Sequence, residues 1–361
     1  MGTSSQRPLR LGRVAALDGL RAVGVLLVVE LHVGLVAGGY IGVDVFLPLS
    51  GFLITALLCE EWEREGDIRL ARFMARRARR LVPALVLLVG LFTLVMATLH
   101  PWGQSWPLGR LAASTLLFAN NWVASFEPHH GAVLGALSPT WTLAQEGQFY
   151  LLWPPVLGAL LAMRARPRAL LAVLAALIVG LLLTAPLLGH LGSAYNTYTS
   201  PFNRGAELLF GCAAAIVWRE RMLPRSIGSP AIGWLLAAAI AYLVYACRVA
   251  SPTVYLAAAA LSALLLVNLL TPSRSRVPGI GRILESPPLR FTGRISYAIY
   301  LFHVPIYYLV WTYVGFDSRY WYGITTPLLS IAFAWISWKL VEQPAMRFTR
   351  RSRRPVRATR I

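Results

Sequence analysis

The sequence predicts an all-α protein, a polytopic transmembrane bundle of about ten helical spans, and three observations lead to this prediction. Hydrophobic residues make up 57% of the 361 residues and charged residues only 14%, against about 45–50% and about 25% in a soluble globular domain. The mean hydropathy is +0.59. Several apolar runs approach the roughly 20 residues that a helix needs to cross the hydrocarbon of a bilayer. A soluble enzyme, a disulfide-stapled secreted domain and a coiled coil are therefore excluded.

Eleven apolar segments are the candidate helices. They cover residues 14–37, 40–58, 81–99, 108–126, 141–163, 169–190, 205–218, 231–247, 253–271, 295–314 and 324–341. We expect a single domain over residues 1–361, embedded in the membrane over about 14–341 and ending in a basic cytoplasmic tail over 342–361.

The net charge of +19 comes almost entirely from arginines, which cluster between the apolar segments. Because positive charge accumulates in cytoplasmic loops, this pattern predicts topology and requires no nucleic acid partner. Arg7, Arg10 and Arg13 place the N-terminus in the cytoplasm. The other clusters, expected on the same side, are 59–80, 164–168, 219–225, 274–290 and 347–360. Some of these arginines could also bind an anionic cofactor.

One stretch breaks the even pairing of spans between these clusters. Three apolar segments lie between residues 80 and 164, and an odd number cannot return the chain to the same side. The segment 108–126 is the weakest, because Asn120 and Asn121 interrupt it. We expect it to be re-entrant or interfacial, covered by protein or water, which leaves ten spans. If it crosses the membrane, there are eleven.

The three cysteines lie in or beside different apolar segments, at Cys59, Cys212 and Cys247. They show no paired spacing, so neither a disulfide nor a metal site is expected.

The first span contains four titratable residues, which are expensive in a membrane and usually mark a pathway or a site. They are Asp18, Arg21, Glu30 and His32. Arg21 and His32 lie about 20° from alignment on one helix face and about 16 Å apart along its axis. Asp18 can pair with Arg21, whereas Glu30 faces away from His32. A deep histidine suits general base catalysis; the alternative is a histidine that only bonds neighbouring helices.

Further positions have both a functional and a structural interpretation. Asp44 is a candidate buried carboxylate, and Ser50 is either a nucleophile or a hydrogen-bonding residue between helices. Arg77 and Arg80 can share a helix face and clamp phosphates, or they only anchor the topology. Glu146 lies at the entry to an apolar helix, where a carboxylate also stabilises the helix end.

Six motifs, taken in order and spacing, resemble the acyltransferase-3 family of membrane O-acyltransferases, which decorate bacterial surface glycans and some natural products. They are LDGLRAVGVLLVVELH (17–32), GYIGVDVFLPLSGFLIT (39–55), RFMARRARRLVPA (72–84), SPTWTLAQEGQFYLLWP (138–154), GRISYAIYLFHVPI (293–306) and VEQPAMR (341–347).

The resemblance implies roles for individual residues. The Arg-x10-His signature and the glutamate of the Trp-x-x-x-x-Glu block indicate a catalytic group of His32, as the base, with Arg21 and Glu146. The Arg-x-x-Arg signature indicates a donor-binding group of Arg77 and Arg80, with the adjacent Arg76. The substrate pocket is expected to include Asp18, Asp44, Ser50, Trp141, Tyr300 and His303.

The resemblance also implies an O-acyltransferase of the bacterial inner membrane. It would move an acetyl or other acyl group from acetyl-CoA, or another acyl-CoA, to a hydroxyl of a cell-surface polysaccharide or other glycan. No metal is implied. Two alternatives stay open: the same chemistry on a macrolide-type secondary metabolite, and a transporter whose interior charges line a permeation path. The oligomeric state is undetermined.

Overall fold

The computed structural model describes residues 9–12, 14–99, 107–126, 132–189, 198–273, 275, 277–315 and 317–351. Within these ranges the regular secondary structure is entirely helical. The α-helices are α1 (Ala15–His32), α2 (Ile41–Glu65), α3 (Leu70–Leu99), α4 (Leu108–Leu116), α5 (Asn120–Phe126), α6 (Thr140–Ala162), α7 (Pro167–Gly189), α8 (Pro201–Arg219), α9 (Pro230–Ala246), α10 (Pro252–Leu270), α11 (Ile280–Leu284), α12 (Pro287–Arg294), α13 (Ser296–Tyr313), α14 (Arg319–Ser337) and α15 (Gln343–Arg351). Short helical turns are η1 (Ala37–Tyr40), η2 (Ala132–Leu137), η3 (Arg225–Gly228) and η4 (Trp338–Glu342).

Local sequence explains many of the helix ends. Four helices, α8, α9, α10 and α12, begin at Ser-Pro pairs, with Ser200, Ser229, Ser251 and Ser286 at the N-cap. A serine can satisfy a free N–H of the first turn, and proline fits the first helical position, where its missing N–H costs nothing. α2 ends at Gly66, whose φ of 69° is the left-handed conformation that glycine adopts without strain.

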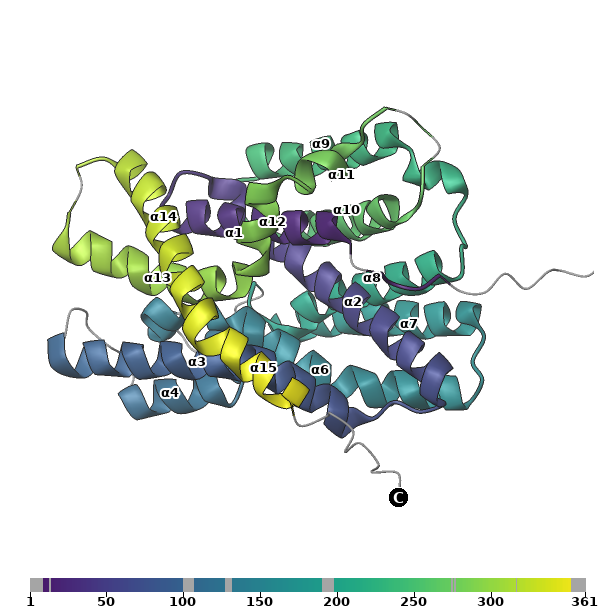
Figure 1. The fold of residues 1–361 in the computed structure, drawn as a ribbon, viewed down its shortest axis with the longest axis horizontal. Helices are drawn as coiled ribbons and strands as arrows, with labels where there is room; N and C mark the ends of the chain where they lie inside the picture. Colours follow the sequence, from purple (N-terminus) through teal and green to yellow (C-terminus); the bar gives the residue numbers. More distant parts are fainter. Residues whose placement is uncertain are drawn as a thin grey trace, which may run out of the picture.

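α2 is the central helix of the bundle. In Figure 1 it runs diagonally through the middle, with α9 and α10 above it and α3 and α6 below it. One face of α2, including Leu47 and Ile54, joins a core shared with α3, α6 and α13. Its opposite face, including Leu49 and Phe52, joins a second core shared with α1, α9 and α10. Residues on α2 therefore lie within reach of both halves of the molecule.

Five of the described helices are long and apolar enough to cross a membrane, or six if the bent pair α12 and α13 counts as one span. This number is below the ten spans expected from the sequence, so that count stays a prediction. α1 is not among these candidate spans because it carries three charged residues, Asp18, Arg21 and Glu30, within 18 residues. α9 is not among them because it is only 17 residues long.

The segment 108–126 consists of two short helices, α4 and α5, with 9 and 7 residues. Each is well below the roughly 20 residues of a membrane span. The two asparagines at the break are fully buried and bonded to α6. Asn120 donates to the hydroxyl of Thr140 at 2.6 Å, and Asn121 donates to the side-chain oxygens of Gln145 and Gln148 at 3.2 and 3.0 Å. Protein thus covers the polar groups of this segment, as a re-entrant or interfacial segment requires.

The other apolar segments each coincide with a helix, and the structure differs mainly at their ends. The first helix stops at His32 rather than near residue 37, and the arginine-rich residues 70–80 are continuous with the third apolar segment in α3. Arg7 and Arg13, and residues 352–361 of the expected tail, lie outside the described residues.

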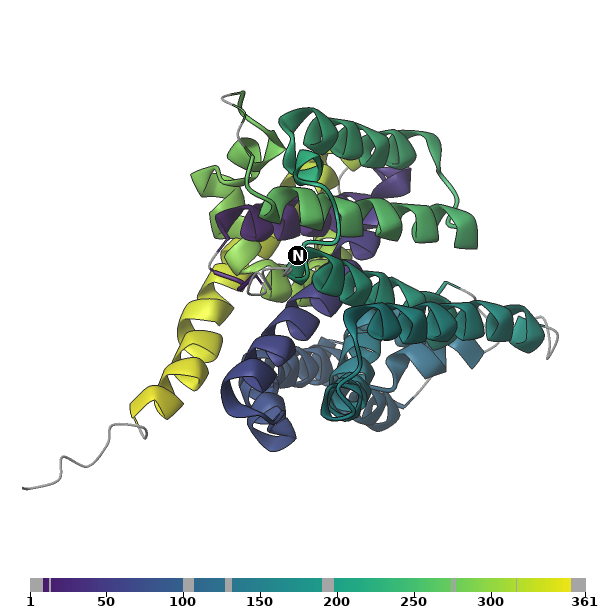
Figure 2. The ribbon, with the colours of Figure 1, turned by 90° about the vertical axis from the view of Figure 1, so that its right-hand side faces the viewer.

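Figure 2 shows α14 and α15 leaning away from the rest of the bundle as one long rod.

Candidate active site

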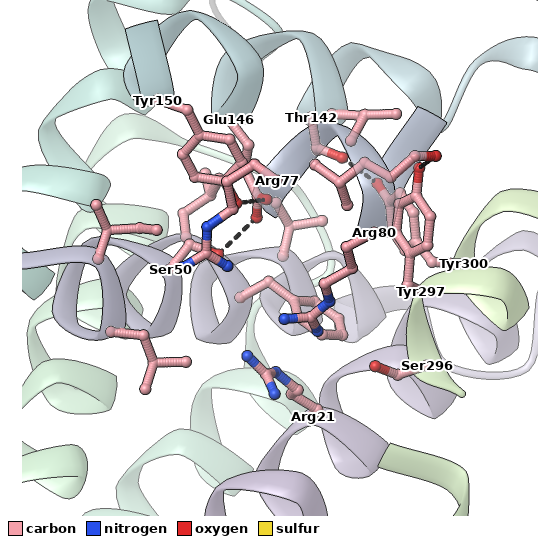
Figure 3. A pocket seen from close by; sticks show the side chains of 17 residues that line it. Arg21, Ser50, Arg77, Arg80, Thr142, Glu146, Tyr150, Ser296, Tyr297 and Tyr300 are labelled. Carbon is pink, nitrogen blue, oxygen red and sulfur yellow. Dashed lines mark hydrogen bonds between the residues drawn. The ribbon is translucent and has the colours of Figure 1, made fainter. Parts of the chain in front are cut away.

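A cavity at the junction of α1, α2, α3, α6 and α13 contains half of the predicted site residues (Figure 3). We name it the arginine cavity. Its polar lining residues are Arg21, Ser50, Arg77, Arg80, Thr142, Glu146, Tyr150, Ser296, Tyr297 and Tyr300. The remaining lining is apolar and comes mostly from α2. An apolar pocket with a few convergent polar groups is the usual form of a small-molecule site.

The arginine cavity carries an excess of positive charge. Figure 3 shows Arg77 and Arg80 of α3 and Arg21 of α1 directed into the same space. Glu146 is the only acidic lining residue, and neither Arg77 nor Arg80 forms an ion pair among the residues that the structure describes. The charges of Arg21 and Arg80 repel each other. An anionic ligand would relieve this repulsion and accept hydrogen bonds from the guanidinium groups.

Glu146 lies on the wall of the arginine cavity that α6 provides. The Ser50 hydroxyl donates to its Oε1 at 2.7 Å, and the Tyr150 hydroxyl donates to its Oε2. The guanidinium of Arg77 lies over the rings of Tyr150 and Phe73, at 5.5 and 5.4 Å from their centroids. Since Glu146 lies well inside α6 rather than in its first turn, it does not cap that helix. Its carboxylate instead joins α2 to α6 and orders the ring beneath Arg77.

A second cavity, the histidine cavity, lies beyond the arginine cavity. His32, Trp141, Tyr198, Thr199 and Tyr300 are among its lining residues. Its volume of about 240 Å³ far exceeds the roughly 10–15 Å³ that a single water needs on the same measure. Trp141 and Tyr198 meet edge to face, with centroids 5.3 Å apart, and form an aromatic wall.

The two cavities share two lining residues, Val43 and Tyr300. The Thr142 hydroxyl donates to the Tyr300 hydroxyl at 2.7 Å, which holds the tyrosine side chain between them. The spacing on α1 thus places Arg21 at one cavity and His32 at the other, on the two sides of this shared wall.

Four predicted site residues lie elsewhere. Arg76 points away from the arginine cavity, and its guanidinium pairs with Glu61 at 2.8 Å. Neighbouring residues on a helix face different directions, so Arg76 cannot share the cavity with Arg77 and Arg80. The structure therefore does not support Arg76 as a donor-binding residue.

The side chains of the other three contact neighbouring residues instead of lining a cavity. Asp18 lies 3.7 Å from Arg21 and lines neither cavity. His303 is fully buried behind His32, with ring nitrogens 3.3 Å apart. Asp44 is fully buried and pairs with Arg204 at 2.7 Å. None of the three contacts the space that a substrate would fill.

Arg204 and its second partner Glu207 are the residues that the sequence analysis missed. Both are fully buried, 2.6 Å apart, and Arg204 lies over the rings of Trp141, Tyr198 and Tyr255, at 4.6 to 5.4 Å. Two of these rings form the aromatic wall of the histidine cavity. Arg204 stands directly before the apolar segment 205–218 and Glu207 lies inside it. Charged residues at such positions are expensive in a membrane, and this pattern could have predicted the ion pair.

Within the described residues, no group of three or more histidine, cysteine or acidic side chains is arranged to hold a metal ion.

A family model described as an acyltransferase domain matches residues 14–339. This range includes every residue that lines the two cavities. No solved structure matches the chain.

Several curated proteins are similar over nearly the whole chain. Peptidoglycan O-acetyltransferase OatA of Listeria monocytogenes is 30% identical over an alignment of 348 residues, which covers 92% of this chain and 55% of that protein. The putative peptidoglycan O-acetyltransferase YrhL of Bacillus subtilis is 29% identical, over 92% of this chain and 54% of its own length. O-acetyltransferase OatA of Staphylococcus aureus is 28% identical, over 91% and 56%. The chain thus spans about half the length of the curated relatives it matches.

Proposed function

The chain belongs to the acyltransferase domain family, and from that premise we propose that it is a membrane O-acetyltransferase that acetylates a cell-wall glycan. The acetyl donor in this proposal is acetyl-CoA or another acyl-CoA. The observation that carries the proposal is the shared wall at Tyr300, where a cavity rich in arginine meets a cavity that contains a histidine. A donor anchored in one cavity can therefore meet an acceptor activated in the other.

The arginine cavity suits the donor because coenzyme A is a polyanion with a neutral thioester end. Guanidinium groups bind phosphate bidentately and more strongly than neutral donors do. Arg77, Arg80 and Arg21 supply three such groups, and the apolar residues of α2 face the space beyond them. The phosphates would bind at the arginines, and the thioester would point along α2 toward Tyr300.

The histidine cavity suits the acceptor. Nε2 of His32 has no hydrogen-bond partner among the described residues, and the side chain lines the cavity. In the proposed step Nε2 takes the proton of an acceptor hydroxyl while that oxygen attacks the thioester carbonyl carbon. The carbon–sulfur bond then breaks, and the coenzyme leaves as a thiol with the proton returned by His32. In this scheme Arg21, about 16 Å along α1 from His32, holds the donor rather than the charge that develops during the attack.

The acceptor class follows from the relatives and from the aromatic wall. Three similar proteins are O-acetyltransferases, two of them named for peptidoglycan. Trp141 and Tyr198 offer apolar ring surface with polar edges, which fits the mixed surface of a sugar ring. A macrolide has the same mixed character, so the assay has to include both kinds of acceptor.

The test is acetyl transfer by the purified protein in lipid nanodiscs, supplied with radiolabelled acetyl-CoA and either soluble peptidoglycan fragments or a macrolide. We expect label on the glycan fragments, and at least about 100-fold slower transfer by the variant His32→Ala, because loss of a general base costs roughly 10²–10⁴-fold. Glu30→Gln is the matched control. Glu30 lies on the same helix but lines neither cavity, so this variant should transfer normally.

Each outcome has a defined meaning. Label on the macrolide alone would replace the acceptor and keep the chemistry. Normal transfer by a well-folded His32→Ala protein would remove His32 as the base. Absence of transfer to any acceptor by the wild type, together with flux of solute across proteoliposomes, would favour the transporter.

A further inference from the structure

His32 and His303 form an imidazole pair between α1 and α13. The proposed reaction uses His32 as the base and gives His303 no role. The two residues are 271 positions apart, yet their rings lie edge to face with centroids 4.8 Å apart. His303 is fully buried and lines neither cavity, whereas His32 reaches the histidine cavity. The pair therefore has an inner member and a member that can touch substrate.

Each imidazole faces a backbone carbonyl with its Nδ1 atom. Nδ1 of His303 lies 2.7 Å from the carbonyl oxygen of Tyr300, and Nδ1 of His32 lies 2.8 Å from that of Val28. A carbonyl oxygen can only accept a hydrogen bond, so each Nδ1 has to carry a proton. In a neutral ring the other nitrogen, Nε2, is then an unprotonated acceptor.

The contact between the rings follows from this assignment. Nε2 of His303 lies 3.3 Å from Nδ1 of His32. The proton on Nδ1 of His32 is thus shared between the Val28 carbonyl and the lone pair of His303. If His303 carried its proton on Nε2 instead, its Nε2–H would face the Nδ1–H of His32. The backbone carbonyl of Tyr300 would then lose the hydrogen bond from Nδ1 of His303.

We propose that His303 is a positioning residue that, together with the Val28 carbonyl, holds His32 in the tautomer protonated on Nδ1 and thereby aims the basic Nε2 lone pair into the histidine cavity. This inference rests on the proposed function, in which His32 is the base. It assigns to a neutral imidazole the orienting role that a carboxylate has in many histidine-dependent enzymes.

The arrangement also favours the charged intermediate. When His32 takes the proton of the acceptor, its ring becomes an imidazolium with a donor on each nitrogen. Nε2 of His303 and the Val28 carbonyl both accept from Nδ1. His32 is also the last residue of α1, where the helix dipole favours a positive charge. Glu30 lines neither cavity, and its carboxylate lies beside Gly323 of α14.

The test compares three variants of His303 in the acetyl-CoA and peptidoglycan-fragment assay. His303→Gln places an acceptor near the former Nε2 and toward His32, whereas His303→Asn places one near the former Nδ1, and His303→Leu has none. We expect kcat to fall about 10- to 100-fold in the Leu and Asn variants, the range expected for a hydrogen bond to a charged group. The Gln variant should recover most of this loss.

Two controls separate positioning from packing. KM for acetyl-CoA should stay within about twofold in all three variants, because His303 does not line the arginine cavity. Phe302→Leu, which trims a buried ring packed on Phe333 at 4.6 Å, should lower thermal stability without the loss in kcat. In the background of His32→Ala, His303→Leu should cause no further loss, since the base it positions is already absent.

Three results would overturn the inference: equal rates for the Gln and Leu variants, a wild-type rate for His303→Leu, or additive losses in the double variant. A readout without turnover keeps it separate from the proposed function. ¹⁵N NMR of histidine-labelled protein should show His32 protonated on Nδ1 in the wild type and a tautomer mixture in His303→Leu. If the wild type transfers no acetyl group, the proposed function fails. The NMR spectrum then decides the tautomer of His32 by itself, and a proton on Nε2 of His32 would contradict the inference.

Discussion

At the scale of single residues, the arginines of α3 divide by direction. Arg72 and Arg76 turn outward and pair with Glu65 and Glu61, at 2.7 and 2.8 Å. Arg77, one position after Arg76, turns inward, and Arg80, three further on, joins it in the arginine cavity. Residues three apart share a helix face and adjacent residues do not, so one basic run supplies both a surface network and a ligand site.

This division leads to a prediction about charge versus geometry. The double variant Arg77→Lys/Arg80→Lys keeps both charges but loses the planar fork that binds phosphate bidentately. Losing a hydrogen bond to a charged group costs roughly 1.5–3 kcal/mol, or about 10- to 150-fold in affinity. We expect acetyl-CoA to bind at least about tenfold more weakly, measured by calorimetry on detergent-purified protein.

The outward arginines provide the matched control. Arg72→Lys/Arg76→Lys makes the same chemical change on the same helix outside the cavity, and donor affinity should not change. Unchanged affinity in the inward pair as well would reduce Arg77 and Arg80 to topological anchors.

At the scale of elements, the pairing of α2 with α8 organises the bundle. Glycines lie at their crossing, where a Cβ on Gly211 would lie 2.7 Å from the carbonyl carbon of Pro48, and one on Gly51 would meet the Leu208 backbone. Small residues allow the backbones of membrane helices to approach closely. The close approach of α8 also brings Arg204 within reach of Asp44 on α2, at 2.7 Å.

We predict that Gly211→Ala destabilises this crossing, because the added methyl would collide with the backbone of α2 rather than with a movable side chain. Overpacking of this kind costs about 1–3 kcal/mol. The thermal midpoint in detergent should fall, and transfer activity should fall with it.

Gly180→Ala on α7 is the comparison for that variant. Nothing lies within 4 Å of a Cβ at Gly180, and alanine has the higher helix propensity. The midpoint should stay the same or rise. An equal fall in both variants would mean that glycine flexibility, and not close approach, explains the effect.

At the scale of the whole molecule, several arginine-rich segments gather at one end. Arg219 pairs with Glu63 at 2.5 Å, and its carbonyl accepts from the Leu9 amide, which joins the end of α8 to the end of α2 and to the N-terminal segment. Ile68, between α2 and α3, lies beside Gly158 in the last turns of α6, about 3.5 Å from where its Cβ would be. α3 therefore starts and α6 finishes near the same end, which favours an even number of crossings from the start of α3 to the end of α6.

The prediction at this scale is a labelling pattern. In a protein whose native cysteines are replaced by serine, single cysteines at Arg64, Arg166 and Arg221 should react with an impermeant maleimide only from the cytoplasmic side. A cysteine at Val249, in the exposed connection between α9 and α10, should react only from outside. External labelling at Arg166 would mean that 108–126 crosses the membrane, with eleven spans and an inverted second half.

The sequence by itself determined which stretches are helical and which residues are candidates for the chemistry. A membrane helix can be predicted from a hydrophobic run because each span has to be apolar over its own length. The spacing of Arg21 and His32 likewise predicted that both lie on one face of α1. The motifs identified Arg77, Arg80 and Glu146 for the same reason, since each is recognised within its own segment.

Only the tertiary structure decided which of these residues meet. Helical periodicity states the face on which a side chain lies, but not what that face opposes, because contacts between helices join residues far apart in the chain. The tertiary structure therefore turned Arg76 out of the cavity, paired Asp44 with Arg204, and brought His303 to His32 across 271 positions. The division of the site into two cavities that meet at Tyr300 is a property of helices packed from across the chain, and no single segment encodes it.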